Sequence, residues 1–268
     1  MDQYAQWLWL VPLGFFAGGY GTLIGAGGGF VLAPALLLLY PGDAPETITS
    51  ISLAVVFFNA LSGTLAYAKS KRIHYRSGII FSLFSIPGAV LGALATTSLT
   101  RERFDLLFGL VLLAVAIFLA ITSGFKGAGR IAQADASMTA INDLSRSALI
   151  IGSLLSSGLG FISSFLGIGG GFLYVPAFIF LLGFPVRAAT ATSLFVLAIT
   201  ALTGSATHLA AGLFHHGMNR ALALSIGAIL GAQAGAKLSQ RIHGDWIVRS
   251  LAIALGLVGV RLIASSLW

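Results

Sequence analysis

The sequence Gly25-Ala26-Gly27-Gly28-Gly29-Phe30-Val31-Leu32-Ala33-Pro34 interrupts a long apolar run near the start of the chain. A second stretch of the same form, Gly167-Ile168-Gly169-Gly170-Gly171-Phe172-Leu173-Tyr174-Val175-Pro176, follows 142 positions later. Each has three consecutive glycines, then phenylalanine, and a proline five positions after the last glycine. Because glycine weakens a helix, two matched triplets in apolar sequence predict two broken membrane helices in a duplicated protein.

Composition places the rest of the chain in a membrane. Of its 268 residues, 57% are hydrophobic and 9% are charged, and the mean hydropathy is +0.96. Soluble proteins carry roughly 25% charged residues. The apolar runs are continuous, unlike the alternating strands of a membrane β-barrel. With no cysteine, disulfides and thiolate chemistry are excluded. The sequence therefore predicts an all-α polytopic membrane protein.

The apolar segments form two sets of five. The first set covers residues 5–24, 30–40, 47–68, 77–97 and 104–122, and the second covers 147–166, 172–182, 188–213, 221–238 and 246–267. The segments 30–40 and 172–182 are each about 16 Å long as helices, half of a bilayer, and can either span or re-enter. We therefore predict a first transmembrane repeat over 1–122, a cytoplasmic linker over 123–146 and a second repeat over 147–268.

Further matches support the repeat. Ile51-Ser52-Leu53 corresponds to Thr192-Ser193-Leu194 at an offset of 141, and the Gly88 to Gly92 region corresponds to Gly227 to Gly231 at an offset of 139. An odd number of segments in each half predicts that the two repeats have inverted topology.

Positive charge orients the protein. If loop 69–76 is cytoplasmic, then so are the linker, the turn at Arg187 and loop 237–249. Those segments hold eleven of the 15 basic residues: Lys69, Lys71, Arg72, Arg76, Lys126, Arg130, Arg146, Arg187, Lys237, Arg241 and Arg249. Both termini and the acidic loop with Asp43 and Glu46 are then expected outside. The formal charge of +7 is explained by this bias, and no nucleic-acid partner is expected.

Each glycine break predicts a place for an anion. A short helix that begins in mid-membrane has N–H groups without partners and a partial positive charge at its start. The candidate ligands for a small anionic substrate are these residues and polar side chains of the third helices: Gly25, Gly27, Gly28, Gly29, Phe30, Ser52, Asn59, Gly167, Gly169, Gly170, Gly171, Phe172, Thr192 and Ser193. The competing interpretation is that the glycines only allow close helix packing.

Other chemistry is weakly represented. His208 is the candidate for proton coupling, although a lone membrane histidine is more often a packing residue. His215 and His216 lack nearby carboxylates, so neither a metal nor a cofactor is expected. Sequence signatures of metalloproteases, serine hydrolases and Walker-type nucleotide sites are missing from the chain, which leaves a membrane-embedded enzyme without support.

The paired Gly-x-Gly-Gly-Gly-Phe-x-x-x-Pro pattern, with a hydroxyl-bearing helix after each copy, resembles the TauE/SafE sulfite exporter family. The resemblance covers essentially the whole chain and implies a multi-pass carrier of the bacterial or archaeal inner membrane. It implies sulfur-containing anions such as sulfite, thiosulfate or organosulfonates as substrates. The family pattern transfers to Gly25, Gly27 to Gly29 and Pro34, and to Gly167, Gly169 to Gly171 and Pro176.

We therefore expect a secondary anion transporter that works by alternating access. An anion channel of the same fold is the alternative, and a membrane enzyme is a weaker one. The sequence leaves open which sulfur anion is moved, whether it is exported or imported, which ion couples transport, and whether the protein is a monomer or a homodimer in the lipid.

Overall fold

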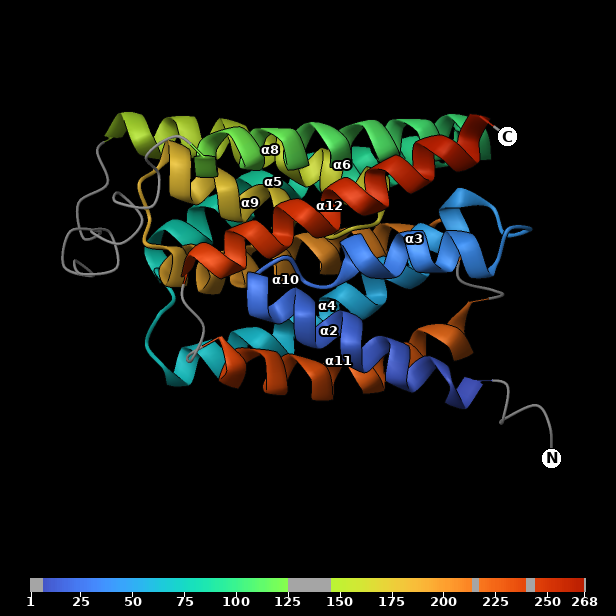
Figure 1. The fold of residues 1–268 in the computed structure, drawn as a ribbon, viewed down its shortest axis with the longest axis horizontal. Coiled ribbons are helices and arrows are strands. Elements are labelled where there is room, and N and C mark those ends of the chain that lie inside the picture. The colour runs from blue at the N-terminus through green and yellow to red at the C-terminus, as the bar shows by residue number, and fades with distance from the viewer. Residues whose placement is uncertain (1–6, 125–145, 214–216, 240–243, 268) are drawn as a thin grey trace.

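The computed structural model describes residues 7–124, 146–213, 217–239 and 244–267 (Figure 1). These parts of the chain are helical, without a strand, which confirms the all-α class. Most of the predicted linker 123–146, together with His215 and His216, lies outside the described residues. The first set of helices is α2 (Leu10–Ile24), α3 (Gly29–Leu39), α4 (Pro45–Lys69), α5 (Tyr75–Thr96) and α6 (Arg101–Gly124). The second is α8 (Arg146–Leu166), α9 (Gly171–Pro176), the π-helix η2 (Ala177–Leu181), α10 (Val186–Ala210), α11 (Met218–Leu238) and α12 (Gly244–Leu267).

Within those described ranges, six helices are long and apolar enough to cross a membrane. They are α4, α5, the Arg101–Ile121 part of α6, α8, α10 and α11. Helix α2 has 15 residues, about 22 Å, which is shorter than the full span predicted for 5–24. Its end at Ile24 agrees with the prediction, because the glycine break follows at once.

The second half-length segment departs from the prediction. We expected one short helix over 172–182, but α9 ends at Pro176 and the chain continues as the π-helix η2. Proline has no N–H and its ring crowds the preceding turn, so a wider turn relieves the clash. The first half-length segment, α3, contains Pro34 and stays α-helical.

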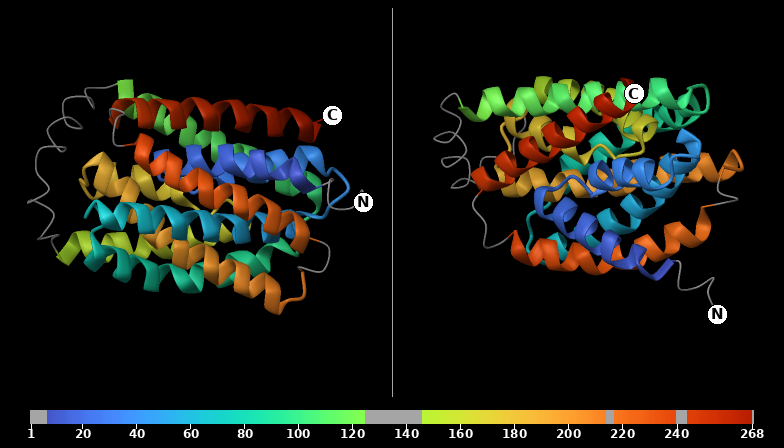
Figure 2. Two further views of the ribbon diagram at one scale, coloured as in Figure 1. Left: turned by 90° about the horizontal axis from the view of Figure 1, so that it is seen from below. Right: turned by 45° about the vertical axis from the view of Figure 1, so that its right-hand side comes forward.

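The helices run roughly parallel in one bundle with α4 and α10 at its centre (Figure 1 and Figure 2). Helix α4 packs against α10 and α11, and α10 packs against α4 and α5. Outside these, α2 lies along α11 and α8 lies along α5, while α6 pairs with α12. Each outer pair therefore joins a helix from before residue 124 to one from after residue 146.

Small residues bring the outer pairs close together. A side chain on Gly231 of α11 would collide with the carbonyl oxygen of Phe15 on α2, and one on Gly92 of α5 with the carbonyl oxygen of Phe161 on α8. Close approach of this kind holds membrane helices together, because lipid supplies no hydrophobic force between them. The matched Gly88 to Gly92 and Gly227 to Gly231 stretches thus serve packing.

One end of the bundle gathers charge from distant segments. Arg220 at the start of α11 pairs with Asp43 in the α3–α4 loop, and its guanidinium lies 4.0 Å from the ring centre of Tyr40 and 5.7 Å from that of Trp7. Arg101 at the start of α6 reaches the same loop. The start of α2 and the end of α12 lie at this end too (Figure 1).

The opposite end is held by rings and hydroxyls. The His74 ring, before α5, lies 5.8 Å from that of Phe184, before α10. Tyr67 near the end of α4 donates a hydrogen bond to Ser239 after α11, at 2.7 Å. The two ends of the bundle thus differ in the interactions that close them.

Candidate functional site

The two glycine stretches have matching backbones. At each break three glycines adopt positive φ angles, a region that side chains disfavour. The angles are 79°, 75° and 76° at Gly25, Gly27 and Gly28, and 69°, 82° and 69° at Gly167, Gly169 and Gly170. The sequence similarity at the breaks therefore encodes one repeated local structure.

The turn in each break folds back on the helix before it. The carbonyl oxygen of Gly21 accepts hydrogen bonds from the N–H groups of Ala26 (2.7 Å) and Gly27 (3.1 Å). In the second break, the carbonyl oxygen of Ser163 accepts from Ile168 (3.2 Å) and Gly169 (3.4 Å). One carbonyl oxygen near the end of each preceding helix thus accepts both hydrogen bonds that close the turn.

Three N–H groups then lack a partner at each break. In α3 the first hydrogen bonds are those from Val31 and Leu32 to the carbonyl oxygen of Gly28. In α9 they run from Leu173 and Tyr174 to that of Gly170. Among the described residues, no hydrogen bond uses the N–H of the three residues before, which are Gly28, Gly29 and Phe30 in the first break and Gly170, Gly171 and Phe172 in the second.

These N–H groups belong to buried residues. Buried backbone donors are nearly always paired, and an unpaired one costs about 1–3 kcal/mol. Each set lies at the positive end of a helix dipole. The arrangement therefore carries two adjacent sets of donors suited to negatively charged oxygens.

The structure brings the two breaks into contact. An added Cβ on Gly171 would lie 2.7 Å from Cα of Ala26, and one on Gly29 would meet the backbone of Ile168. Val56 of α4 and Leu197 of α10 are fully buried between the breaks, since added Cβ atoms on Gly27 and on Gly169 would each meet both side chains. The centre of the bundle is closed by this apolar pair.

The two equivalent serines have different surroundings. Ser193 donates to the carbonyl oxygen of Gly25 at 2.9 Å and lies at the same distance from that of Thr190. Ser52 is fully buried and its hydroxyl has no partner. Ser193 therefore holds the first break in place, whereas Ser52 has a free donor.

Asn59 and Thr192 form hydrogen bonds with residues outside the two breaks. Asn59 accepts a hydrogen bond from Thr22 of α2 at 3.2 Å, and its buried amide nitrogen is unpaired. The hydroxyl of Thr192 accepts the N–H of His74 at 3.1 Å, at the start of α5. Asn59 thus connects α4 to α2 through its amide oxygen and keeps an unpaired amide nitrogen, while Thr192 connects α10 to the start of α5.

The remaining predicted residues have side chains in the core. The rings of Phe30 and Phe172 are fully buried, so these residues offer the site their N–H groups. His208 lies in the last turn of α10, buried, with both ring nitrogens unpaired. The structure does not place His208 in contact with either break.

Sequence reasoning missed Ser163. Its hydroxyl is fully buried and unpaired, and it faces Gly170, where an added Cβ would lie 2.8 Å from it. The corresponding position before the first break is Gly21, which has no side chain. A serine four residues before the second Gly-x-Gly-Gly-Gly pattern was the available signal.

Comparison with known proteins identifies the family of the chain. The model of the family described as Sulfite exporter TauE/SafE matches residues 10–262. The chain is 36% identical to the probable membrane transporter protein YunE of Bacillus subtilis, over 95% of this chain and 96% of YunE. It is 28% identical to the probable membrane transporter protein MJ0441 of Methanocaldococcus jannaschii, over 95% and 96% of the two chains. No solved structure matches.

The fold and these relatives define a multi-pass membrane protein of a transporter class rather than an enzyme. The chain belongs to the TauE/SafE sulfite exporter family, which confirms the resemblance seen in the paired glycine pattern.

Proposed function

We propose that this protein is a secondary transporter that moves a small sulfur-containing anion, such as sulfite, thiosulfate or an organosulfonate, across the inner membrane by alternating access. The observation that carries the proposal is the pair of breaks in contact, each with three buried N–H groups that have no partner. Close packing explains small residues between helices, but it does not explain six unpaired donors in one place.

The chemistry of these donors suits transport. Backbone N–H groups and hydroxyls bind an oxyanion without a full positive charge beside it. A buried arginine would form a strong charge-assisted pair that hinders release. Neutral donors at helix starts therefore favour a site that both binds and releases its anion.

The inverted repeat supplies a mechanism. The helix packing supports such a repeat. Helix α2 of the first half packs on α11 of the second half, and α8 of the second half packs on α5 of the first half in the same way. Helices α4 and α10 lie between these two pairs. Two inverted halves, 1–122 and 147–268, can rock about the central pair so that the breaks face either side in turn. Separation of Val56 and Leu197 would open the centre in each half of the cycle.

The charge distribution suggests an orientation. The end with Trp7, Asp43, Arg101 and Arg220 corresponds to the side predicted outside, and the end with loop 69–76 to the cytoplasmic side. Both termini would then be outside and residues 123–146 inside.

Transport assays in proteoliposomes test the proposal. We expect uptake of radiolabelled sulfite or thiosulfate that saturates, and uptake that is accelerated by unlabelled anion inside the vesicles. Empty vesicles and vesicles with an unrelated membrane protein are the controls. Ohmic anion current without saturation or counterflow would instead establish the channel alternative.

A binding panel narrows the substrate. Purified protein is heated with sulfite, thiosulfate, sulfate, taurine or chloride, since a ligand that binds the folded state raises the melting temperature. We expect sulfur oxyanions or sulfonates to give the largest shifts at equal ionic strength. A shift with chloride alone would contradict the proposed substrate class.

A further inference from the structure

We propose that the anion is held asymmetrically, with Ser163 and Ser52 as its side-chain ligands at the second break, while the first break closes against it. This inference rests on the proposed transport function and assigns Ser163 a role in the binding of a small oxyanion. It begins from the difference between two breaks whose backbones are alike.

Ser163 stands at the second set of free N–H groups. Its hydroxyl is fully buried and unpaired, and it lies beside Gly170, the residue before the start of α9. Its own carbonyl oxygen accepts the two N–H groups that shape the break. Because the carbonyl of Ser163 is fixed by these bonds, its hydroxyl is held beside Gly170, the first residue with a free N–H in this break.

Ser52 approaches the second break from α4. Thr49 lies against Gly167, where an added Cβ would be 2.6 Å from Cα of Thr49, and Val56 lies against Gly169. Ser52 falls between Thr49 and Val56 on the same helix face, at spacings of three and four residues. Ser52 and its unpaired hydroxyl therefore lie on the face of α4 that packs against the segment from Gly167 to Gly169.

The first break lacks both features. Gly21 occupies the position that corresponds to Ser163 and has no hydroxyl. Ser193 corresponds to Ser52, and its hydroxyl is engaged with the carbonyl oxygens of Gly25 and Thr190. The first break thus offers backbone donors alone, whereas the second adds two free hydroxyls in the part of the molecule that accepts the anion.

Four single variants of the full-length protein test the asymmetry. Dissociation constants for sulfite and thiosulfate are measured by calorimetry on detergent-purified protein, and melting temperatures are measured without added anion. Ser163→Ala and Ser52→Ala should weaken binding about tenfold or more, since each loses a hydrogen bond to a charged group. Their melting temperatures should stay the same or rise, because an unpaired buried hydroxyl is removed.

Two further variants serve as comparisons. Ser193→Ala should lower the melting temperature, because it loses its bonds to Gly25 and Thr190, and it should weaken binding less than Ser52→Ala does. Ser164→Ala removes another buried, unpaired hydroxyl, but that hydroxyl faces Gly204, 2.6 Å from an added Cβ there. Because Ser164 points away from the break, this matched variant should bind the anion like the wild type.

The outcomes separate the two proposals. If the wild type binds neither sulfite nor thiosulfate, the proposed function fails for these anions and the ligand assignment fails with it. If the wild type binds and Ser163→Ala binds equally well, or Ser193→Ala weakens binding as much as Ser52→Ala, the asymmetry is wrong and the transport proposal stands. Weaker binding in Ser163→Ala and Ser52→Ala than in Ser193→Ala, with unchanged binding in Ser164→Ala, supports the asymmetry.

Discussion

The two half-length helices begin alike and end differently. Helices α3 and α9 both follow a glycine with positive φ, Gly28 and Gly170, and both leave three N–H groups free. At its far end α3 is held by arginines, whereas the segment after α9 widens into η2 and packs its rings against neighbours. The N-terminal ends of the two helices therefore share one backbone geometry. Their C-terminal ends are fixed by different interactions, with arginines in one case and aromatic rings in the other.

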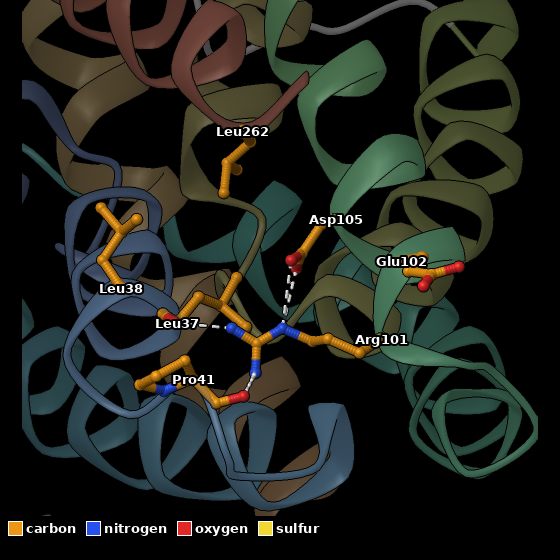
Figure 3. Close-up of a pocket in the computed structure, with 7 residues that line it drawn as sticks. All are labelled: Leu37, Leu38, Pro41, Arg101, Glu102, Asp105 and Leu262. Atoms are coloured by element: carbon orange, nitrogen blue, oxygen red, sulfur yellow. Dashed lines mark hydrogen bonds and ion pairs between the residues drawn. The ribbon is translucent and has the colours of Figure 1, made fainter. Parts of the chain in front are cut away.

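The anchor of α3 is the side chain of Arg101. Figure 3 shows it reaching from α6 toward α3, with its guanidinium between the Asp105 carboxylate and the carbonyl oxygens of Leu37 and Pro41. The distance to the Leu37 oxygen is 2.6 Å. These residues line a cavity of about 260 Å³. A positive charge at the C-terminal end of α3 also complements the helix dipole.

The anchor of the second segment is aromatic. The ring of Phe178 in η2 lies 5.4 Å from that of Phe184 and 5.4 Å from that of Phe81 on α5. The N–H of Phe184 donates to the carbonyl oxygen of Phe178 at 2.9 Å. Ring packing tolerates the irregular turn after Pro176, because it needs contact area more than fixed donor positions.

The largest effect on transport is expected for substitutions of the glycines that precede α3 and α9. Gly28→Ala and Gly170→Ala should each reduce anion uptake more than tenfold, because an added Cβ would lie 2.6 Å from the Ala17 oxygen or the Ser163 Cβ. Gly183→Ala is the matched control, since Gly183 also has a positive φ of 70° but open space around its Cβ. It should cost about 1 kcal/mol of stability and keep transport. Equal loss in all three variants would show that φ alone matters.

The second largest effect is expected when Arg101 at the charged end of the bundle is replaced. Arg101→Ala removes the donors to Leu37 and Asp43 and leaves the buried Asp105 carboxylate unpaired. We expect a loss of about 2–4 kcal/mol in the free energy of unfolding, which is measured by denaturant titration. Arg101→Met with Asp105→Leu should recover part of this loss. No recovery would mean that the backbone contacts, rather than the carboxylate, dominate.

The second arginine should contribute less. Arg220→Met loses the ion pair with Asp43 and the contact with the Tyr40 ring, both partly exposed to solvent. The expected loss is about 1 kcal/mol, and added salt should reduce the difference from the wild type. A difference that does not change with salt would assign the effect to ring contact alone.

The smallest effect is expected at the end of the bundle that holds His74 and Phe184, where the melting temperature should depend on pH. Burial, with a smaller contribution from Arg76, lowers the pKa of His74 from its ordinary 6.5, and its Nδ1 accepts the N–H of Ser77. Because the folded pKa is depressed, the unfolded chain binds the proton more readily, so the contribution is full above about pH 6.5 and is lost as pH falls through the folded pKa. The melting temperature should drop more between pH 7.5 and 5.5 in the wild type than in His74→Gln. Equal drops would remove His74 as the cause.

Much of the fold could be predicted from the pattern of apolar runs. The ends of α2 and α8 and the starts of α3 and α9 fall within a residue of the predicted breaks, because consecutive glycines mark them directly. The turn into η2 was not predicted, since Pro34 in α3 and Pro176 in α9 have the same spacing but different local structures.

The site was only partly predictable. The glycines were found by repetition, but the difference between Ser52 and Ser193 was not, because it depends on which carbonyl oxygen lies nearby in the folded protein. Likewise, Arg101 donates to the carbonyl oxygen of Leu37, which lies 64 positions earlier in the sequence, and no local sequence pattern predicts that contact. Periodicity identifies faces of helices, while partners across the bundle require the folded structure.

The exchange of outer partners has a consequence for biogenesis. When synthesis has reached residue 124, α2 and α5 are complete, but their main neighbours α11 and α8 have not been made. The glycine-containing faces of both helices therefore have no partner helix in the bilayer until α8 and α11 have been synthesised. The protein therefore cannot finish folding one half at a time, and the two halves, produced as separate chains, should each depend on the other to escape degradation.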